Sequence, residues 1–482
     1  MPWRKIRKYI LYVLAAIVIY LVVGLIVPFL QKKSVKNTSG PDKLIEQAMT
    51  DKKSPDRAMI LETNQSALEE RIRLIHMAKE RIVLTTFDMR EGESTSDILS
   101  LLYQKAEAGV KIQILIDGVS GALRLRGVPL FQTIASHENI EIRIYNELNP
   151  VFPWKAMGRM HDKYVIVDQM AYILGGRNTF DYFIGNYITK GISYDREALI
   201  YNTDSLSAQK QADSQTSNSS IFELYQYFEE MWNYPECKTY DGGGISDDET
   251  ETVKTFLGKR YQQLKDKYPQ LFSDYDYCQS TDETKGVTLL KNEKHIYSKE
   301  PLIFYELTEL MKRAKKKAVI HTPYIVADDY MLSALTDVCK KVPVTLMTNA
   351  RENGDNVVAS SDYTYHRSDV LSTGVSLLEY MGGVSYHGKS VVIDDELAII
   401  GSYNFDMRST YVDTELMLAI RSKDVCTRLN RYMEDYHKDS CPVKKDGGRE
   451  NPEGIDVKDL PPVKNAIFHT LGLILQPFRI LV

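Results

Sequence analysis

The sequence predicts an α/β protein with two pseudo-symmetric lobes, each a mixed, mainly parallel sheet flanked by helices, after one transmembrane helix. Three observations lead to this fold class. Strand-like and helix-like segments alternate in the same order twice along the chain. The pattern HxKxxxxD occurs once in each of these two stretches, at the same place. Residues 9–30 form an apolar run without a charged side chain.

The composition is that of a folded protein with several domains. The chain has 482 residues, of which 43% are apolar and 26% are charged, and this length is roughly three times that of a typical domain. The net charge of −5 provides no overall basic field to attract nucleic acid. The five cysteines form no CxxC pair, which argues against a zinc site. Disulfides Cys237–Cys278 or Cys426–Cys441 and five free thiols remain alternatives.

The N-terminal residues 1–36 are expected to form a short stub and a transmembrane anchor. Residues 9–30 are long enough, as a helix, to cross the ~30 Å hydrocarbon layer. A cleaved signal peptide is the alternative, but its apolar core is normally shorter, and we find no small-residue cleavage site after Phe29. Four basic residues precede the run and three follow it, at positions 4, 5, 7 and 8 and at 32, 33 and 36. This slight bias favours a cytoplasmic N-terminus, with the bulk of the chain outside.

The two lobes are expected at residues 37–235 and 299–440. In the first, helix-like residues 68–78 and 98–109 alternate with apolar strands at 81–87, 110–117 and 140–145. In the second, helix-like residues 302–314 and 330–341 alternate with strands at 317–324, 342–350 and 375–380. Strands that alternate with helices of this length predict βαβ units, and continuous apolar strands predict that both sheet faces are covered.

Three other regions are expected to lie outside these lobes. Residues 236–298 read as a linker or insert, and the polar residues 202–220 read as a surface loop. Residues 441–482 are a polar linker followed by an apolar tail that is too short to span a membrane comfortably. The tail either lies in the membrane interface or fills an apolar groove of the protein.

The two motifs carry the candidate chemistry. In both, a lysine follows the histidine by two residues, an aspartate by seven and an asparagine by seventeen. On a strand, residues two apart project from one face, so each histidine and its lysine point to one place. Glycines that precede each asparagine would allow the backbone to approach a ligand closely. The eight residues are His161, Lys163, Asp168 and Asn178, and His387, Lys389, Asp394 and Asn404.

This set of side chains suits phosphodiester chemistry. The lysines can neutralise the phosphodiester charge, and the asparagines can donate hydrogen bonds to its non-bridging oxygens. One neutral imidazole can attack phosphorus, while the other, protonated, gives its proton to the departing alcohol. No carboxylate cluster with metal-ligand spacing accompanies the motifs, so we expect neither a metal ion nor another cofactor.

Carboxylates are also expected to orient the imidazoles and fix their tautomers. Glu197 and Glu415 occupy matching strands after the two motifs, and we assign this role to them. Asp168 and Asp394, at the far end of each motif strand, are counted among the catalytic residues, with a supporting hydrogen-bond role as the alternative.

At these residues the chain resembles the phospholipase D superfamily, and within it most closely bacterial cardiolipin synthases. The resemblance rests on MHDKYVIVD followed by GGRN, on GSYNFDMRS followed by TEL, and on TPYIVADDYMLSAL and HENIEIRIYN. It implies a bilobal fold in which both motifs face one active site, with His161 as nucleophile and His387 as acid and base. It also implies phosphatidyl transfer at a bilayer, in which phosphatidylglycerol as acceptor yields cardiolipin.

Other activities use the same residues. A hydrolase of the phospholipase D type would release phosphatidic acid, and a single-span exonuclease of the superfamily would cleave single-stranded nucleic acid. The acidic net charge weighs against a nucleic-acid partner. A non-catalytic scaffold is disfavoured because both motifs are intact. The sequence leaves the oligomeric state open.

Overall fold

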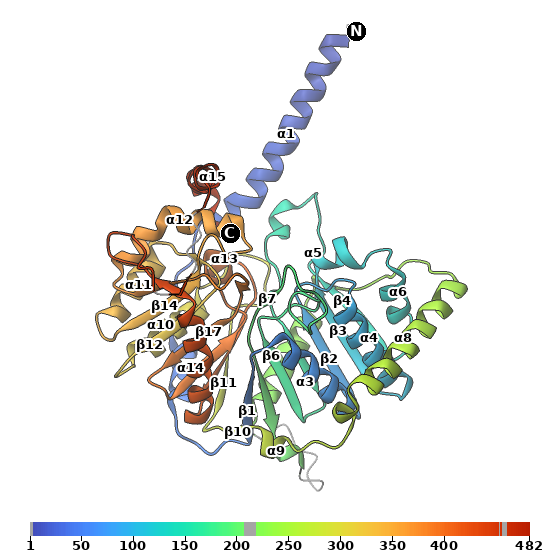
Figure 1. The fold of residues 1–482 in the computed structure, drawn as a ribbon. Coiled ribbons are helices and arrows are strands. Elements are labelled where there is room, and N and C mark those ends of the chain that lie inside the picture. Colours follow the sequence, from blue (N-terminus) through green and yellow to red (C-terminus); the bar gives the residue numbers. More distant parts are fainter. Residues whose placement is uncertain (1–2, 207–217, 453, 456–459) are drawn as a thin grey trace.

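Two α/β lobes lie side by side in the computed structural model, and a long N-terminal helix projects away from both (Figure 1). The structure describes residues 3–206, 218–452, 454–455 and 460–482. Each lobe is built on one large mixed sheet with helices against it, as the sequence predicted.

The sheet of the first lobe has nine strands and includes β5, the strand of the first motif. Its order, within the described residues, is β10 (Asp282–Glu283), β1 (Asp56–Leu61), β8 (Glu197–Asn202), β6 (Ala171–Gly175), β5 (Tyr164–Val167), β2 (Arg81–Thr86), β3 (Lys111–Asp117), β4 (Ile140–Tyr145) and β9 (Cys237–Thr239). The helices of this half are α3 (Asn64–Met77), α4 (Glu93–Glu107), α5 (Gly118–Ser120), α6 (Pro129–Ala135), α7 (Ser220–Trp232), α8 (Asp247–Lys267) and α9 (Tyr277–Ser280).

The sheet of the second lobe repeats the same plan. Its order is β11 (Val287–Lys291), β20 (Leu416–Arg421), β18 (Leu397–Gly401), β17 (Lys389–Ile393), β12 (Ala318–His321), β14 (Val344–Asn349), β15 (Ser376–Tyr380) and β21 (Ser440–Pro442). Its helices are α10 (Leu302–Lys312), α11 (Asp329–Cys339), α12 (Val357–Ser372), α13 (Met407–Tyr411) and α14 (Lys423–Lys438).

The expectation of mainly parallel sheets was wrong in one respect. Parallel pairing joins β2, β3 and β4 in one sheet and β12, β14 and β15 in the other, whereas the remaining neighbours are antiparallel. Each motif strand folds back on the next as a hairpin, β5 with β6 and β17 with β18. Their continuous apolar sequences resemble parallel strands because both faces of each sheet are buried, which does not require a parallel neighbour.

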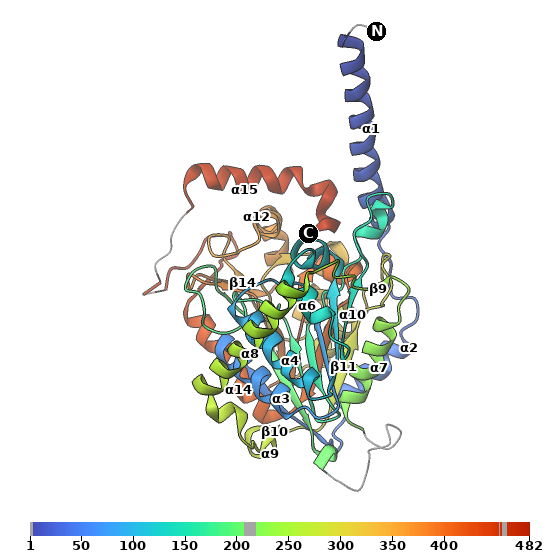
Figure 2. The same ribbon diagram turned by 90° about the vertical axis from the view of Figure 1, so that its right-hand side faces the viewer.

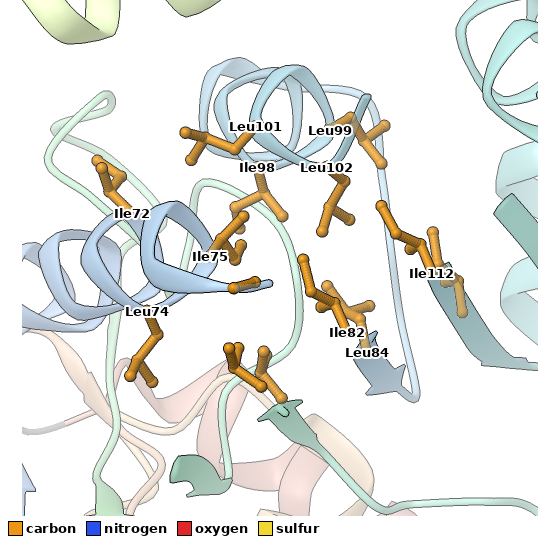
Figure 3. Packing of buried hydrophobic residues seen from close by; sticks show 14 of the residues in the cluster. Ile72, Leu74, Ile75, Ile82, Leu84, Ile98, Leu99, Leu101, Leu102 and Ile112 are labelled. Atoms are coloured by element: carbon orange, nitrogen blue, oxygen red, sulfur yellow. The ribbon is translucent and has the colours of Figure 1, made fainter. Parts of the chain in front are cut away.

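The outer core of the first lobe lies between its sheet and two amphipathic helices (Figure 3). Thr63 caps α3 by accepting the N–H of Ser66, and Ile72 and Ile75 of that helix, fully buried, face the sheet. Leu99 and Leu102 of α4 and Ile82 of β2 complete the contact. Burial of such side chains contributes about 1.5–3 kcal/mol each, so this layer holds the sheet rigidly.

A second core joins the lobes, because the two sheets face one another. It contains Val83 and Ile200 from the first sheet and Val392 and Ile400 from the second. Helix α7 of the first lobe packs on β11 of the second, and α14 of the second packs on β1 of the first. The lobes are therefore interlocked, and residues from both can be held in fixed positions at their junction.

Two segments belong elsewhere than the sequence suggested. Residues 236–298, expected as a linker, supply β9 and β10 to the first sheet and β11 to the second, and α8 covers α4. Helix α2 (Ser39–Met49), assigned to the first lobe, packs instead on α10 and β11 of the second. Of the polar segment 202–220, residues 207–217 lie outside the described residues.

The first and the last elements of the chain, α1 and η5, are in contact at one end of the molecule. Helix α1 (Trp3–Leu30) contains a candidate membrane span at Lys5–Leu30, by length and composition. The C-terminal helix α15 (Pro462–Ile474) and the turn η5 (Gln476–Leu481) lie near its base, with α15 crosswise to α1 (Figure 2). The five cysteines are free thiols, so neither disulfide forms.

Candidate active site

The two motif histidines precede the central hairpin of each sheet, and each is bonded to the opposite lobe. The peptide N–H of His161 donates to the carbonyl of Thr414 (3.2 Å), and that of His387 donates to the carbonyl of Tyr194 (2.6 Å). Short strand β16 (Ser385–Tyr386), just before His387, pairs with β7 (Ser193–Tyr194) of the first lobe. These crossed backbone contacts place both motifs at the junction of the lobes.

Each imidazole contacts a buried carboxylate of the other lobe. His161 Nδ1 lies 2.8 Å from Glu415 Oε1, and His387 Nδ1 lies 2.6 Å from Asp195 Oδ2. A protonated Nδ1 that donates to a carboxylate leaves Nε2 as the free ring nitrogen. Both histidines therefore present the same atom for chemistry.

Glu197 does not have the role that we assigned to it. Both of its oxygens accept from Arg71, at 2.8 and 2.6 Å, and Arg177 lies 3.5 Å away. Glu197 is the first residue of β8. Asp195 precedes that strand and directly follows β7, which pairs with β16 of the second lobe. The carboxylate that reaches His387 is therefore Asp195.

In the second lobe the equivalent pair of acidic residues has the opposite roles, because the glutamate contacts the histidine and the aspartate does not. Both lobes contain an Asp-x-Glu sequence, at Asp195–Glu197 and Asp413–Glu415. In the second, Glu415 reaches the histidine, while Asp413 accepts from Arg408 Nε (2.8 Å) and from the N–H of Arg159 (3.1 Å). Matching the two halves by sequence could locate this acidic pair but could not choose between its members.

The motif lysines lie against their own histidines. Lys163 Nζ donates to the carbonyl of His161 (2.5 Å), and Lys389 Nζ lies 2.6 Å from Nδ1 and 3.2 Å from Nε2 of His387. Burial lowers the pKa of Lys163 to about 7 and also lowers the pKa of Lys389. The charge of Lys389, in the second motif, lowers the pKa of both His161 and Lys163 in the first, so the two motifs lie in one electrostatic environment.

The two histidines differ in their electrostatic surroundings. Burial, followed by the charges of Lys163 and Lys389, holds the pKa of His161 well below its ordinary value. Its partner Glu415 has a pKa raised by burial to about 8. Burial also lowers the pKa of His387, but Asp195 opposes this, and Lys389 and His387 hold the pKa of Asp195 below its ordinary value. His161 is thus favoured as the neutral imidazole, and His387 has the ionised carboxylate that stabilises an imidazolium.

The two asparagines lie at the same junction with unequal contacts. Asn178 Oδ1 accepts the N–H of Asp88 (3.2 Å), which leaves the amide NH₂ group to donate elsewhere. Asn404 is only 6% exposed, and its Oδ1 has no hydrogen-bond partner among the described residues. The unpaired oxygen can accept a hydrogen bond from a ligand, whereas the NH₂ group of the same amide can donate one.

Asp168 and Asp394 were expected among the catalytic residues, but they clamp the backbone at the far end of the motif strands. Asp168 accepts the N–H groups of residues 79, 80 and 81 at 2.8–2.9 Å. Asp394 accepts those of residues 315, 316 and 317 at 2.5–3.0 Å. Each aspartate fixes the turn that enters the strand beside its motif, β2 or β12, so the supporting role is the one observed.

The glycines near the asparagines make room for protein and not for a ligand. A Cβ at Gly175 would lie 2.5 Å from the carbonyl of Arg196, and one at Gly401 would lie 2.1 Å from that of Leu416. A Cβ at Gly176 would lie 2.4 Å from the Asp195 carboxylate. These glycines therefore allow close approach of the strand that carries the histidine-orienting acid.

Two aromatic rings that the sequence analysis did not select flank the histidines. Phe87 lies edge-on to His161 (ring centroids 5.3 Å apart) and Tyr324 edge-on to His387 (6.0 Å). Each follows the strand next to its motif, β2 or β12, within the sequences TTF and TPY. This shared position in the two repeats is the sequence signal from which both aromatic rings could have been predicted. No group of three or more His, Cys, Asp or Glu that could hold a metal ion occurs among the described residues.

Comparison with known proteins agrees with this geometry. The sequence pattern of the family described as "Cardiolipin synthase, PLD-like domain" matches residues 71–232 and 307–437, which together are more than half of the chain. Cardiolipin synthase 1 of Bacillus cereus is 25% identical over 391 residues, covering 80% of this chain and 67% of that protein. Cardiolipin synthase C of Escherichia coli is 23% identical over 417 residues, covering 77% and 82%.

A solved structure shows the same fold. The phosphatidylserine synthase of Haemophilus influenzae matches with a TM-score of 0.62 and 14% identity, covering 92% of this chain and 100% of that one.

Proposed function

We propose, because this chain belongs to the family of cardiolipin synthase, PLD-like domain proteins, that it is a membrane-anchored phosphatidyltransferase. It transfers a phosphatidyl group from one phospholipid to the hydroxyl of another through a phospho-histidine intermediate. The observation that carries the proposal is the crossed pairing of His161 with Glu415 and of His387 with Asp195. Two imidazoles with opposed electrostatic settings at one junction suit an enzyme that needs one nucleophile and one acid.

In the first half-reaction, Nε2 of His161 attacks the phosphorus of the donor lipid. The bond from phosphorus to the head-group alcohol breaks, and His387 gives its proton to the departing oxygen. Lys163 and Lys389 offset the negative charge on the non-bridging oxygens, and Asn178 and Asn404 donate hydrogen bonds to them. The product is a phosphatidyl group covalently bound to His161.

In the second half-reaction, His387 is neutral and removes the proton from the hydroxyl of the acceptor lipid. That oxygen attacks phosphorus, the bond to His161 breaks, and His387 is again protonated for the next cycle. Asp195 supports this cycle because an ionised carboxylate at 2.6 Å stabilises each imidazolium state.

The proposed substrates are phospholipids in a bilayer, with phosphatidylglycerol as acceptor. When phosphatidylglycerol is also the donor, the products are cardiolipin and glycerol. Helix α1 anchors the enzyme in the cell membrane, and the slight excess of basic residues before the span favours a cytoplasmic N-terminus with the catalytic lobes on the outer side.

The test uses the full-length protein in phosphatidylglycerol vesicles, with lipid mass spectrometry of the products. Cardiolipin and glycerol in equal amounts are expected. Phosphatidic acid as the sole product would show that the enzyme is a hydrolase and not a transferase. Cleavage of single-stranded DNA without lipid turnover would show that it is a nuclease.

Trapping of the intermediate assigns the two histidines. In a quenched reaction, an acid-labile adduct with a base-stable phosphorus–nitrogen bond should be trapped on His161; His387→Asn should permit trapping, and His161→Asn should abolish it. Adducts found only on His387 would reverse the two roles.

A further inference from the structure

Helix α1 is in contact with a loop of the first lobe well before the helix ends. The Tyr20 hydroxyl donates to the carbonyl of Val151 (2.6 Å). Gly24 faces Pro153 so closely that a Cβ at Gly24 would lie 2.4 Å from the proline ring. The loop therefore runs along α1 beside positions that belong to its apolar run, residues 9–30.

These contacts fix the depth of the loop relative to a bilayer that α1 crosses. Tyr20 precedes Leu30 by ten residues, which in a helix is about 15 Å along the axis. The charged residues Lys32 and Lys33 follow directly and belong in the head-group region. Because half of the ~30 Å hydrocarbon layer is about 15 Å thick, a loop that contacts α1 between Tyr20 and Leu30 lies below the head groups and reaches no deeper than the middle of the bilayer.

The side chains of the loop suit that position. Leu148, Val151 and Phe152 are 41%, 62% and 42% exposed. Trp154 lies edge-on to Phe152, with ring centroids 5.4 Å apart. Exposed apolar and aromatic side chains together are disfavoured in water and are typical of membrane interfaces.

The second lobe presents another apolar element at the same end of the molecule. Helix α15 lies crosswise to α1, as an element in the plane of a membrane would (Figure 2). Its buried Phe468 and Gly472 pack toward α12. Val463, Ile467 and Ile474, at helical spacings of four and seven residues, lie on the opposite side and are 73%, 48% and 57% exposed.

The helix is held in this position by the residues that follow it. The turn η5 contacts α1, and Arg479 donates from Nε to Asp362 of α12 (2.7 Å). The tail thus packs on the protein through one face and leaves the other face open, on the side toward which α1 projects (Figure 2).

From these contacts we propose that loop residues 148–154 and the outer face of α15, residues 463–474, insert into the leaflet from which α1 emerges, with the exposed Glu147 at the level of the head groups. We name these two segments the membrane collar. Each lobe contributes one of them, and α1 stands between. The occupant of both apolar surfaces is the lipid bilayer, because α1 carries both surfaces to the level of the bilayer. The proposal rests on α1 as an anchor and holds whatever reaction the site performs.

The collar is connected to the active site by the backbone that follows the loop. Asn146 Nδ2 donates to the carbonyls of Lys155 (2.5 Å) and Gly158 (2.8 Å), at both ends of the stretch that leads to His161. These bonds tie the residue before the loop to the segment that leads from the loop to His161. Lipid contact at Val151 holds the site next to the head groups of the same leaflet.

The experiment is site-specific photo-crosslinking in the full-length protein reconstituted into phosphatidylglycerol and phosphatidylethanolamine nanodiscs. A benzophenone side chain replaces Val151 or Ile467, and adducts are identified by mass spectrometry. Ile17, 49% exposed on α1, is the positive control, and Phe256, 44% exposed on α8 away from α1, is the matched control for an exposed apolar position.

Lipid adducts at positions 151 and 467 should approach the yield at position 17 and exceed the yield at position 256 at least tenfold. Yields at 151 or 467 equal to that at 256, with lipid adducts at 17, would overturn the collar. Protein–protein adducts in place of lipid at 467 would assign that face to a second copy of the chain. Absence of lipid adducts at 17 would remove the anchor on which the proposal depends.

Discussion

Nδ1 of His161, in the first lobe, and Oε1 of Glu415, in the second, lie 2.8 Å apart. The peptide N–H of His161 also donates to Thr414, the residue before Glu415. Both ends of this contact depend on how the lobes pack, so neither lobe alone contains an oriented motif histidine. The same is true of His387 and Asp195. The chemistry of the protein is thus a property of the junction, and changes at the junction should separate catalysis from folding.

The first prediction concerns the two acidic residues after the first motif. Asp195→Asn should lower kcat by about 10²–10⁴, because the amide cannot stabilise the imidazolium of His387. The fold should survive, since Asn fills the same volume. Steady-state turnover and the thermal midpoint Tm measure the two effects.

Glu197→Gln is the matched control, two residues away. It leaves Arg71 and Arg177 without a charge partner, so stability should fall by about 3–5 kcal/mol, while kcat of the folded fraction stays within about threefold. The reverse result, with turnover lost in Glu197→Gln and kept in Asp195→Asn, would restore the assignment made from the sequence.

The second prediction concerns the lysines of the two motifs. Lys163 and Lys389 come from different lobes, and both should contact one phosphate. Each single Lys→Met change should lower kcat by about 10²–10³, the loss expected when a contact that tightens in the transition state is removed. Half of the activity remaining in either variant would indicate two independent sites.

The double variant should lose far less than the product of the two single losses, because residues that act as a unit fail together. Full multiplicativity of the two losses in kcat would show that the lysines act separately.

Much of the site could be predicted from the sequence because two copies of one pattern identify each other. His161, Lys163 and their counterparts lie together at the junction, as the repeat indicated. An aspartate, Asp195, contacts one histidine, whereas a glutamate, Glu415, contacts the other. This difference could not be predicted, because it depends on which acidic residue lies beside the strand pair β7–β16 between the lobes. Sequence periodicity reports the face of a strand within its own lobe and carries no information on the facing lobe.

The fold shows the same limit. The parallel strands β2, β3 and β4 are separated by helices, and that alternation is visible in the sequence. The hairpins β5–β6 and β17–β18 were not predicted from the sequence, because their turns, at Asp168 and Asp394, lack the Asn-Gly or Gly-rich signals typical of tight hairpins. Both aspartates have positive φ, 49° and 54°, a conformation that Asp adopts more readily than most residues.

The third prediction concerns the pH dependence of kcat/KM, which reports ionisations of the free enzyme. The lowered pKa of His161 keeps this imidazole neutral, so the rate should not begin to fall until the pH is well below 6.5. His387 must be protonated to act as the acid, and Lys163, with a pKa of about 7, loses its charge above neutral pH, so the rate should fall on the basic side.

Lys163→Arg tests this assignment, because arginine stays charged throughout the accessible range. The basic limb should move upward by more than one pH unit, even if the absolute rate is lower. A basic limb that does not move would belong to another group, with His387 as the first candidate.

The last prediction separates the backbone clamps from the catalytic groups. Asp394→Asn removes a charged acceptor from three consecutive N–H groups, so stability should fall by about 2–4 kcal/mol. Asparagine tolerates the positive φ of 54° at this position, so the loss of stability reports the loss of the hydrogen bonds.

Burial alone would raise the pKa of Asp394, but the three N–H groups lower it overall. Its stabilisation is therefore complete above pH ~5 and is lost as the pH falls through the folded-state pKa. The acid-unfolding curve of the variant should accordingly be shallower below pH ~4. At a temperature where both variants are folded, kcat should stay within about threefold of the unsubstituted enzyme. A loss of 10² or more in kcat at unchanged Tm would return Asp394 to the catalytic residues.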